Sequence, residues 1–361
     1  MQGVSLSNPE AVAPDQRPLP VVFSCAGETL TPAERALFEK ANPFGFILFK
    51  NNCVSPNQVR WLIKEMRHAA GRDDAPIFID QEGGRVARLQ MPHWPKHPPA
   101  RLFGAIYEED AEWGTEAMRL NARLLASELW DLGITVNCAP VLDLFVQGAS
   151  NAIGDRALSR KPTAVAELAR MEAETFLAHG VLPVIKHIPG HGRLNVDPHL
   201  VSPVINATRA ELESEDFVPF ELLKDLPMAM NSHAVFAALD SEAPASLSAK
   251  VHQEIIRGEI GFDGLLLSDD LNMKALSAKP AERAKAALAA GSDVILYCNG
   301  SVEEMGQIVS VLSPMGDESW ARWERAKSMV KPPPKDYNPS ADSARLDILL
   351  GAVAYQVKSA S

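Results

Sequence analysis

The sequence is poor in cysteine and contains no long apolar run. Only four of its 361 residues are cysteines (Cys25, Cys53, Cys138 and Cys298), and they are widely separated. Small proteins that depend on disulfides carry cysteines at a much higher density, so we expect four reduced thiols packed inside the protein. No uninterrupted apolar segment approaches the ~20 residues that cross a bilayer as a helix. These two shortages argue against a disulfide framework and against a membrane protein.

Basic residues are also fewer than acidic ones. Lys and Arg number 35 against 46 Asp and Glu, giving a net charge of -11, which argues against nucleic acid or a membrane as the main partner. The GxGxxG-type and Walker patterns are absent, so we expect no nucleotide cofactor. Residues 1–18 are polar and contain prolines, without the apolar core of a secretory signal. We therefore predict a cytoplasmic protein.

What the chain does contain is a regular alternation of predicted strands and helices. Its apolar fraction of 46% and charged fraction of 22% are typical of a globular protein. Short apolar runs bounded by turn residues predict strands, and N-cap signals mark the helices between them. The predicted strands cover residues 20–24, 45–49, 76–79, 134–137, 183–185, 228–233, 264–268 and 293–297. The predicted helices begin near residues 31, 55, 110, 162, 209, 248 and 280.

Such an unbroken alternation predicts parallel strands joined by crossover helices. Eight units in roughly 300 residues favour an α/β fold with a single domain, a (β/α)8 TIM-type barrel. A doubly wound open sheet remains the alternative, because the pattern does not show whether the sheet closes. We expect residues 1–18 to form an N-terminal extension, 19–331 the catalytic barrel, and 332–361 a linker and helix that pack on the barrel.

The polar side chains of the predicted strands gather at their carboxyl ends. In a (β/α)8 barrel these ends converge on one face, and that face holds the active site. The sequence therefore predicts an enzyme rather than a purely structural protein. The residues at these ends are Asp80, Asp143, Lys186, His187, Ser232, His233, Asp269 and Asp270.

Residues 183–199, PVIKHIPGHGRLNVDPH, are the densest of these polar segments. The segment begins as a buried strand and continues into a loop marked by glycine and proline. Its side chains His187, His191, Asp197 and His199 offer the nitrogen and oxygen ligands that zinc prefers, so a metal-dependent hydrolase is one interpretation. A solvated polar loop without a role is the other. Sensitivity of the activity to chelators would identify the metal-dependent hydrolase.

Five motifs in order resemble glycoside hydrolase family 3, in particular its single-barrel β-N-acetylglucosaminidases of bacterial cell-wall recycling. The resemblance covers roughly residues 20–310, and five ordered motifs are far more specific than one. The motifs are IDQEGGRVARL (79–89), APVLDL (139–144), GDRALS (154–159), KHIPGHG (186–192) with DPH (197–199), and LSDDLNMKAL (267–276).

The resemblance implies a retaining exo-hydrolase that forms a covalent glycosyl-enzyme. It places the nucleophile on Asp269 and the acid/base on His199, with Asp197 orienting the imidazole ring. Spacing alone does not choose Asp269 over Asp270, which we interpret as a helix cap or a supporting group. The implied substrate-binding residues are Asp80, which accepts from sugar hydroxyls, and the donors Arg88, Arg156, Lys186 and His187.

The same resemblance implies a substrate class and a set of alternatives. The substrate would be a small carbohydrate, a muropeptide of the type GlcNAc-anhydroMurNAc, hydrolysed by a monomer without metal or cofactor. Another family 3 exo-glycosidase, such as a β-glucosidase, is the nearest alternative. A non-catalytic sugar-binding barrel is disfavoured, because every matched catalytic position holds a competent residue.

Supporting roles are expected for the remaining polar residues of these motifs. We expect Arg85 to make a structural ion pair, and Asp143 to be a structural carboxylate at a strand end. His191 and Gly192 are expected to shape the loop. For His233, lining of the site and support of the site are equally consistent with its position.

Overall fold

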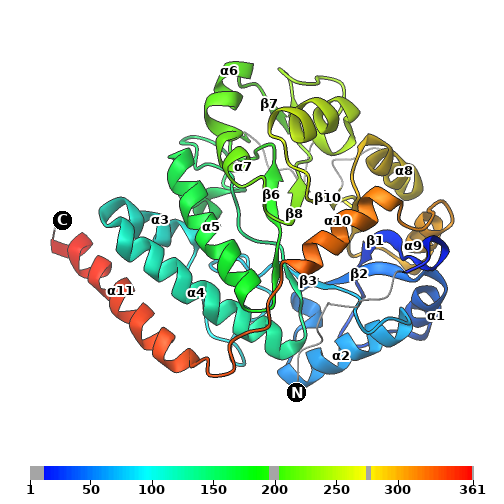
Figure 1. Ribbon diagram of the computed structural model, residues 1–361, viewed down its shortest axis with the longest axis horizontal. Coiled ribbons are helices and arrows are strands. Elements are labelled where there is room, and N and C mark those ends of the chain that lie inside the picture. Colours follow the sequence, from blue (N-terminus) through cyan, green and yellow to red (C-terminus); the bar gives the residue numbers. More distant parts are fainter. Residues whose placement is uncertain (1–11, 195–202, 274–277, 360–361) are drawn as a thin grey trace.

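The computed structural model describes residues 12–194, 203–273 and 278–359, with side chains described up to residue 351. Its main sheet is parallel throughout, in the order β5-β4-β3-β2-β1-β11-β10-β8-β6 (Figure 1). The strands are β1 (Leu19–Phe23), β2 (Pro43–Leu48), β3 (Ile77–Ile79), β4 (Val136–Asn137), β5 (Leu182–Pro183), β6 (Ile185–Ile188), β8 (Met228–Asn231), β10 (Leu265–Asp270) and β11 (Val294–Tyr297).

The two ends of this order, β5 and β6, are one strand interrupted only at Val184. The chain itself therefore closes the ring, and an additional bridge joins Val141, after β4, to Lys186 of β6. Counting β5 and β6 once, the nine strands occupy eight positions around the ring. The predicted (β/α)8 barrel is confirmed, and the open doubly wound sheet is wrong.

Helices surround the strands on the outside (Figure 1). Those between the strands are α1 (Pro32–Ala41), η2 (Lys50–Asn52), α2 (Pro56–Ala69), α3 (Ala100–Glu109), α4 (Ala111–Leu132), η3 (Gly154–Arg156), α5 (Pro162–Ala178), α6 (Arg209–Glu211), η4 (Leu212–Asp216), α7 (Val218–Leu222), η5 (Ala245–Leu247), η6 (Val251–Glu259) and α8 (Pro280–Ala290). η1 (Pro14–Gln16) precedes β1, and α9 (Val302–Val309), α10 (Asp317–Ser328) and α11 (Pro339–Ser359) follow β11. A two-stranded sheet of β7 (Val204–Ile205) and β9 (Val235–Phe236) lies outside the ring.

Local sequence signals explain where several of these helices begin. The side chain of Thr31 accepts from the backbone amide of Glu34, and the Glu34 carboxylate accepts from the amide of Thr31, which forms a capping box ahead of Pro32. Two expected helices are irregular. The one expected at 209–223 is divided into α6, the π-helix η4 and α7, and the one expected near Ser248 is the π-helix η6.

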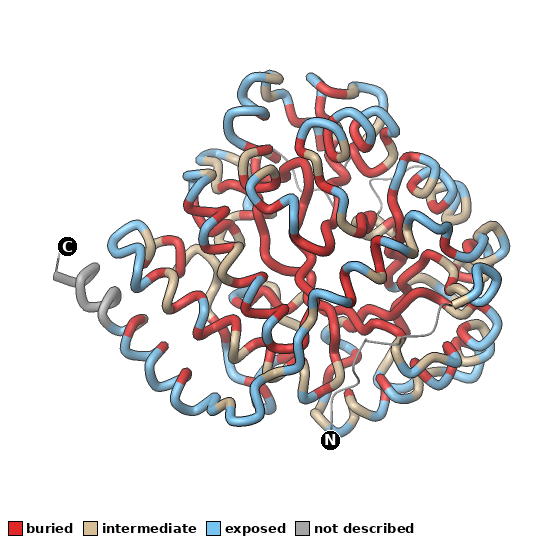
Figure 2. The backbone as a smooth tube through the Cα atoms, viewed as in Figure 1, coloured by how far each residue is buried: buried red, intermediate tan, exposed pale blue. Residues whose placement is uncertain are grey.

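Apolar side chains fill the barrel interior toward the amino ends of the strands. Phe44 at the start of β2 meets Trp323 of α10 edge to face, with ring centroids 4.8 Å apart. Trp323 thus joins the cluster of the barrel interior, and the buried residues, red in Figure 2, concentrate toward the centre of the molecule. The interior cluster includes Val22, Phe44, Phe78, Val136, Leu182, Val184, Met228, Leu265, Val294 and Trp323.

All four cysteines are free and buried, as predicted. Burial raises the pKa of Cys25 and of Cys53 to about 12, so both thiols are protonated near neutral pH. Within the described part of the chain, no helix has the length and apolar character needed to cross a membrane.

The C-terminal helix α11 lies along α4 on the outside of the barrel (Figure 1). Asp342 pairs with Arg123 at 2.9 Å, Arg345 pairs with Glu116 at 2.9 Å, and Leu346 is buried against the barrel helices. These contacts support our proposal that residues 332–361 form a terminal segment packed on the barrel, distinct from the catalytic part.

The buried carboxyl group of Glu172 on α5 should make the stability of the fold depend on pH. Its side chain is buried, and burial, reinforced by the charge of Glu82, raises its pKa to about 8. A carboxyl group whose folded-state pKa is raised stabilises the fold at low pH, and this stabilisation is lost as pH rises from about 4.5 to about 8. The Glu172→Gln variant lacks this titration, so its melting temperature should exceed that of the wild type increasingly between pH 5 and pH 9.

The matched control for this prediction is Glu174→Gln, because Glu174 lies on the same helix with a side chain that is 57% exposed. That variant should follow the wild type at every pH. A constant difference between Glu172→Gln and the wild type across the pH range would show that folding does not raise the pKa of Glu172.

Candidate active site

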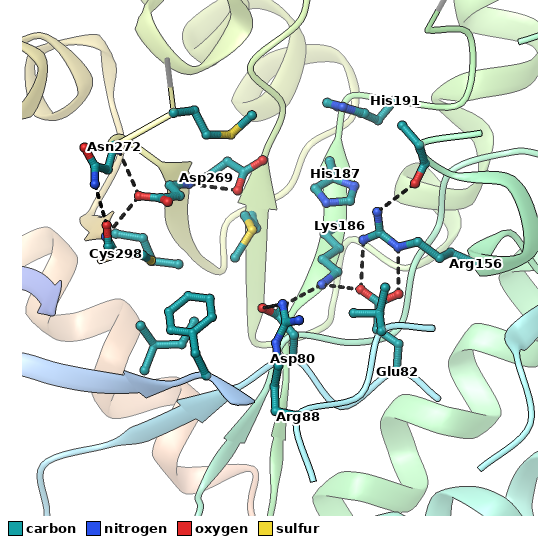
Figure 3. A pocket seen from close by; sticks show the side chains of 18 of the residues that line it. Asp80, Glu82, Arg88, Arg156, Lys186, His187, His191, Asp269, Asn272 and Cys298 are labelled. Atoms are coloured by element: carbon teal, nitrogen blue, oxygen red, sulfur yellow. Dashed lines mark hydrogen bonds and ion pairs between the residues drawn. The ribbon is translucent and has the colours of Figure 1, made fainter. Parts of the chain in front are cut away.

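A cavity of about 930 Å³ opens at the carboxyl ends of the strands, on the predicted face of the barrel (Figure 3). Its wall comes from the carboxyl-terminal parts of β2, β6, β8, β10 and β11 and from the segments that follow β2, β3, β4, β6, β10 and β11. Among its lining residues are Phe49, Asp80, Glu82, Arg85, Arg88, Asn151, Arg156, Lys186, His187, His191, Met230, Asp269, Asp270, Asn272 and Cys298. All five predicted substrate-binding residues and Asp269 therefore line one cavity.

Asp80 directly follows β3 and holds two cations. Its Oδ1 accepts from Lys186 Nζ at 2.9 Å, and its Oδ2 accepts from Arg88 Nη2 at 2.9 Å. Burial alone would raise the pKa of Asp80, but the charges of Lys186 and Arg88 hold it well below its usual range. The carboxylate is therefore ionised, and each oxygen keeps a lone pair for a further donor.

Glu82 plays the equivalent role on the other side of Lys186, and the sequence reasoning missed it. Lys186 Nζ lies 2.6 Å from Glu82 Oε1, and Arg156 donates to both Glu82 oxygens at 2.8 Å. Burial opposes ionisation of Glu82, but Arg156 and Lys186 lower its pKa to about 2. The signal was present: residues two apart in an extended segment point to the same side, so Glu82 accompanies Asp80.

Lys186 lies at the centre of this network and has a side chain only 2% exposed. Burial alone would lower the pKa of Lys186, but Asp80 and Glu82 outweigh it and raise the pKa. The sequence placed Lys186 just beyond a strand that ends at residue 185, whereas β6 continues to Ile188. The network thus joins two carboxylates to three cations (Lys186, Arg88 and Arg156) and leaves one positive charge in excess.

His187 is oriented by Asp143. Its Nδ1 lies 2.6 Å from Asp143 Oδ2, while Asp143 Oδ1 accepts from the backbone amide of His191 at 2.7 Å. Asp143 is thus a structural carboxylate, as predicted, and one that fixes both the His187 ring and the following turn. Because Nδ1 is engaged, Nε2 is the ring nitrogen left for a substrate in the cavity.

The following turn places a second imidazole in the cavity wall. His191 Nδ1 lies 2.7 Å from Ser232 Oγ, and burial, together with the neighbouring His187, lowers the pKa of His191 to about 3. His191 is therefore neutral and lines the cavity in addition to shaping the loop. Gly192 is required by close packing, because a Cβ atom there would lie 2.2 Å from the carbonyl oxygen of Leu144.

Asp269 and Asp270 end β10 and differ in their surroundings. Asp270 Oδ1 accepts from the backbone amides of Asn272 at 2.9 Å and of Cys298 at 3.0 Å, which joins the segments after β10 and β11. Asp269 Oδ1 accepts from the amide of Asp270 at 2.8 Å. Burial raises the pKa of Asp270 to about 6, whereas the neighbouring His233 and His187 outweigh burial and lower the pKa of Asp269.

Both ring nitrogens of His233 are engaged. Nδ1 lies 2.6 Å from Ser246 Oγ, and Nε2 donates to the carbonyl oxygen of Asp270 at 3.0 Å. Of its two expected roles, His233 therefore has the supporting one: it holds the end of β10. Arg85 makes the expected ion pair, with Nε 2.7 Å from Asp155 Oδ1, and it also donates to the carbonyl of Asn151.

Asp197 and His199, the predicted acid/base pair, lie outside the described residues. The metal interpretation needs the same two side chains together with His187 and His191. Among residues 12–194, 203–273 and 278–359, no group of three or more His, Cys, Asp or Glu side chains has a metal-binding arrangement.

Comparison with known proteins identifies relatives along most of the chain. The glycosyl hydrolase family 3 N-terminal domain matches residues 25–330. A beta-hexosaminidase of Chromobacterium violaceum is 36% identical over 310 residues, covering 85% of this chain and 86% of the relative. A beta-hexosaminidase of Alkalilimnicola ehrlichii is 39% identical over 284 residues, covering 78% of this chain and 80% of the relative.

Solved structures of similar proteins share the fold of this chain. NagZ from Neisseria gonorrhoeae, in complex with N-trifluoroacetyl-D-glucosamine, superposes with a TM-score of 0.82 and is 30% identical, covering 94% of this chain and all of that structure. A family 3 beta-N-acetylglucosaminidase from Paenibacillus superposes with a TM-score of 0.80 at 27% identity, covering 91% of this chain and 66% of that structure.

The charge network around Lys186 predicts a large effect for Glu82→Gln. The substitution keeps the shape of the side chain but leaves Arg156 and Lys186 under-compensated in a buried site. Removing one partner of a buried ion pair typically costs about 3–5 kcal/mol. We expect the free energy of unfolding, measured by urea denaturation, to fall by several kcal/mol.

Glu116→Gln is the matched control, because it removes a carboxylate paired with Arg345 in a salt bridge whose arginine side chain is 46% exposed. Its effect should stay below about 1 kcal/mol. Equal losses for the two variants would show that the Glu82 network is not a tightly coupled charge cluster.

Proposed function

This chain belongs to glycosyl hydrolase family 3, and we propose that it removes terminal β-linked N-acetylglucosamine from muropeptide-type fragments by a retaining, two-step mechanism. The glycoside hydrolase class and the β-hexosaminidase type follow from the family and its relatives. The mechanism rests on one observation. The Asp269 carboxylate lines the same cavity as the charge network around Lys186.

In the first step, Asp269 attacks the anomeric carbon. A bond forms between a carboxylate oxygen and this carbon while the bond to the leaving oxygen breaks, which gives a covalent glycosyl-enzyme. The lowered pKa of Asp269 supports this role, because an attacking carboxylate must be ionised. Asp270 has a raised pKa and one oxygen bound to two backbone amides, so it is better suited to holding the β10 end than to attacking.

The leaving oxygen needs a proton, and we assign its donor to His199 on the strength of the family resemblance. Asp197, two residues earlier, would orient the imidazole and stabilise its protonated form. In the second step the same imidazole, now neutral, takes a proton from the water that attacks the glycosyl-enzyme. The second step releases the sugar with its original anomeric configuration and regenerates Asp269.

The remaining residues of the cavity would bind the sugar. Asp80 has lone pairs left for sugar hydroxyls, and Lys186, Arg88, Arg156 and His187 supply donors for hydroxyls and for the acetamido carbonyl. The carboxylates Asp80 and Glu82 hold these cations in place before substrate arrives. Such preorganisation lowers the cost of ordering side chains on binding.

The proposed function also includes a terminal sugar, a leaving group, an oligomeric state and a cellular location. Relatives named beta-hexosaminidase favour N-acetylglucosamine over glucose as the terminal sugar, so a β-glucosidase is the less supported alternative. A cavity of about 930 Å³ has room for part of a leaving group beside one sugar. A muropeptide leaving group, a monomeric state and a cytoplasmic location complete the proposed function.

A slow fluorinated N-acetylglucosamine analogue with a good leaving group should label this enzyme on Asp269. The covalent intermediate would accumulate, and mass spectrometry of a proteolytic digest would locate it. The Asp269→Asn variant should take no label and should lose all measurable turnover, because no carboxylate remains to attack.

Two outcomes would contradict this assignment. A label on Asp270 would show that Asp270 is the nucleophile, and labelling by the corresponding glucose analogue alone would favour a β-glucosidase. Asp225→Asn, an exposed position on the outside of the barrel, serves as the control and should be labelled like the wild type.

A further inference from the structure

Arg193 lies outside the cavity wall and is nevertheless held by two carboxylates. Its Nε donates to Asp216 Oδ2 at 2.6 Å, and its Nη2 pairs with Glu215. Both acceptors lie at the end of the π-helix η4, and Asp216 is only 3% exposed. A guanidinium group can engage two carboxylates at once through its fixed planar donors, which a lysine ammonium does less well.

The residues on both sides of Arg193 are also fixed. The backbone amide of His191 donates to Asp143, and Gly192 packs directly on the backbone of Leu144. The carbonyl of Leu194 accepts from the amide of Ser150 at 2.6 Å. Residues 191–194 are therefore attached to the segment after β4 on one side and to η4 on the other.

This attachment lies immediately before the proposed acid/base pair in the sequence. Asp197 and His199 follow Leu194 by three and five residues. Only a few residues therefore connect the attachment point to the acid/base pair, and a displacement of Leu194 is passed on through this short length of chain.

We propose that Arg193 is a positioning residue for the acid/base pair, and that its ion pairs with Asp216 and Glu215 fix the point from which the segment carrying Asp197 and His199 starts. This inference rests on the proposed function, because it gives Arg193 a role only through His199. Arg193 is not among the residues that line the cavity, and within the described part of the chain its ion pairs are with Asp216 and Glu215.

Loss of Arg193 should consequently affect only the steps that move a proton. A sugar leaving group needs protonation in the first step, whereas a dinitrophenolate leaves without it. General acid catalysis is typically worth about 10²–10⁴-fold, and a misplaced acid loses part of this. The second step needs the same imidazole as a base with either substrate.

The experiment compares Arg193→Met with the wild type on chitobiose and on dinitrophenyl β-N-acetylglucosaminide. We expect kcat/KM for chitobiose to fall at least tenfold and kcat/KM for the dinitrophenyl substrate to change less than twofold. The dinitrophenyl substrate should show a burst followed by slower turnover, because the base for water attack is displaced. Arg193→Lys keeps the charge but not the planar donors. Its kcat/KM for chitobiose should lie between those of the wild type and Arg193→Met.

Arg170→Met is the matched control, because Arg170 makes a comparable pair with Asp225 on the outside of the barrel and should leave both substrates unaffected. Equal losses on both substrates, or no loss on chitobiose, would overturn the positioning role. The unchanged dinitrophenyl rate reports correct folding, and if Arg193→Met does not fold, Glu215→Gln and Arg193→Lys carry the same comparison.

His199→Ala, measured in parallel, separates the two levels of the proposal. If His199→Ala shows the selective loss and Arg193→Met does not, the positioning role fails and the proposed function stands. If His199→Ala shows no selective loss, the acid/base assignment fails, and the role of Arg193 fails with it.

Discussion

The active site depends on the burial of one ammonium group. Lys186 reaches into the barrel from β6, where its charge is stable only because Asp80 and Glu82 lie within 2.9 and 2.6 Å. Each of these carboxylates then holds a further cation, Arg88 or Arg156, at the cavity wall. A buried network of this kind is weak evidence for stability, but it fixes the positions of three donors before any substrate binds.

At the end of β10, the carboxylate that would react is distinct from the residues that hold the strand in place. Asp270 is bound to backbone amides and His233 is engaged at both ring nitrogens, and together they hold the end of β10. Asp269 lines the cavity with a lowered pKa, although it is next to Asp270 in the chain. Two neighbouring carboxylates thus acquire different chemistry from their surroundings alone.

The sequence was sufficient for the barrel and for most of its polar face. Alternating strands and helices, with polar residues at the carboxyl ends of the strands, predicted Asp80, Lys186, His187 and Asp269 in one site. The end of β6 was placed too early, because Lys186 and His187 are polar and follow an apolar run, whereas both are buried residues within the strand. A buried lysine is recognisable only once its partner carboxylates are known.

Other features depended on contacts between distant segments, which a single sequence does not reveal. The bidentate pair of Glu82 with Arg156 joins residues 74 apart, and Asp143 contacts His187 across 44 positions. The π-helices η4 and η6 carry ordinary helical patterns, so their wider turns were not predicted. Arg193 likewise contacts Asp216 and Glu215 across 23 and 22 positions.

We propose that Asp269 and then water attack the same anomeric carbon, in two successive displacements. Proton NMR of the first sugar released from an aryl β-N-acetylglucosaminide tests this most directly, provided spectra are collected before mutarotation. Two displacements restore the starting configuration, so β-N-acetylglucosamine should appear first and convert slowly to the anomeric mixture. Initial release of the α-anomer would mean a single displacement by water and would contradict the account.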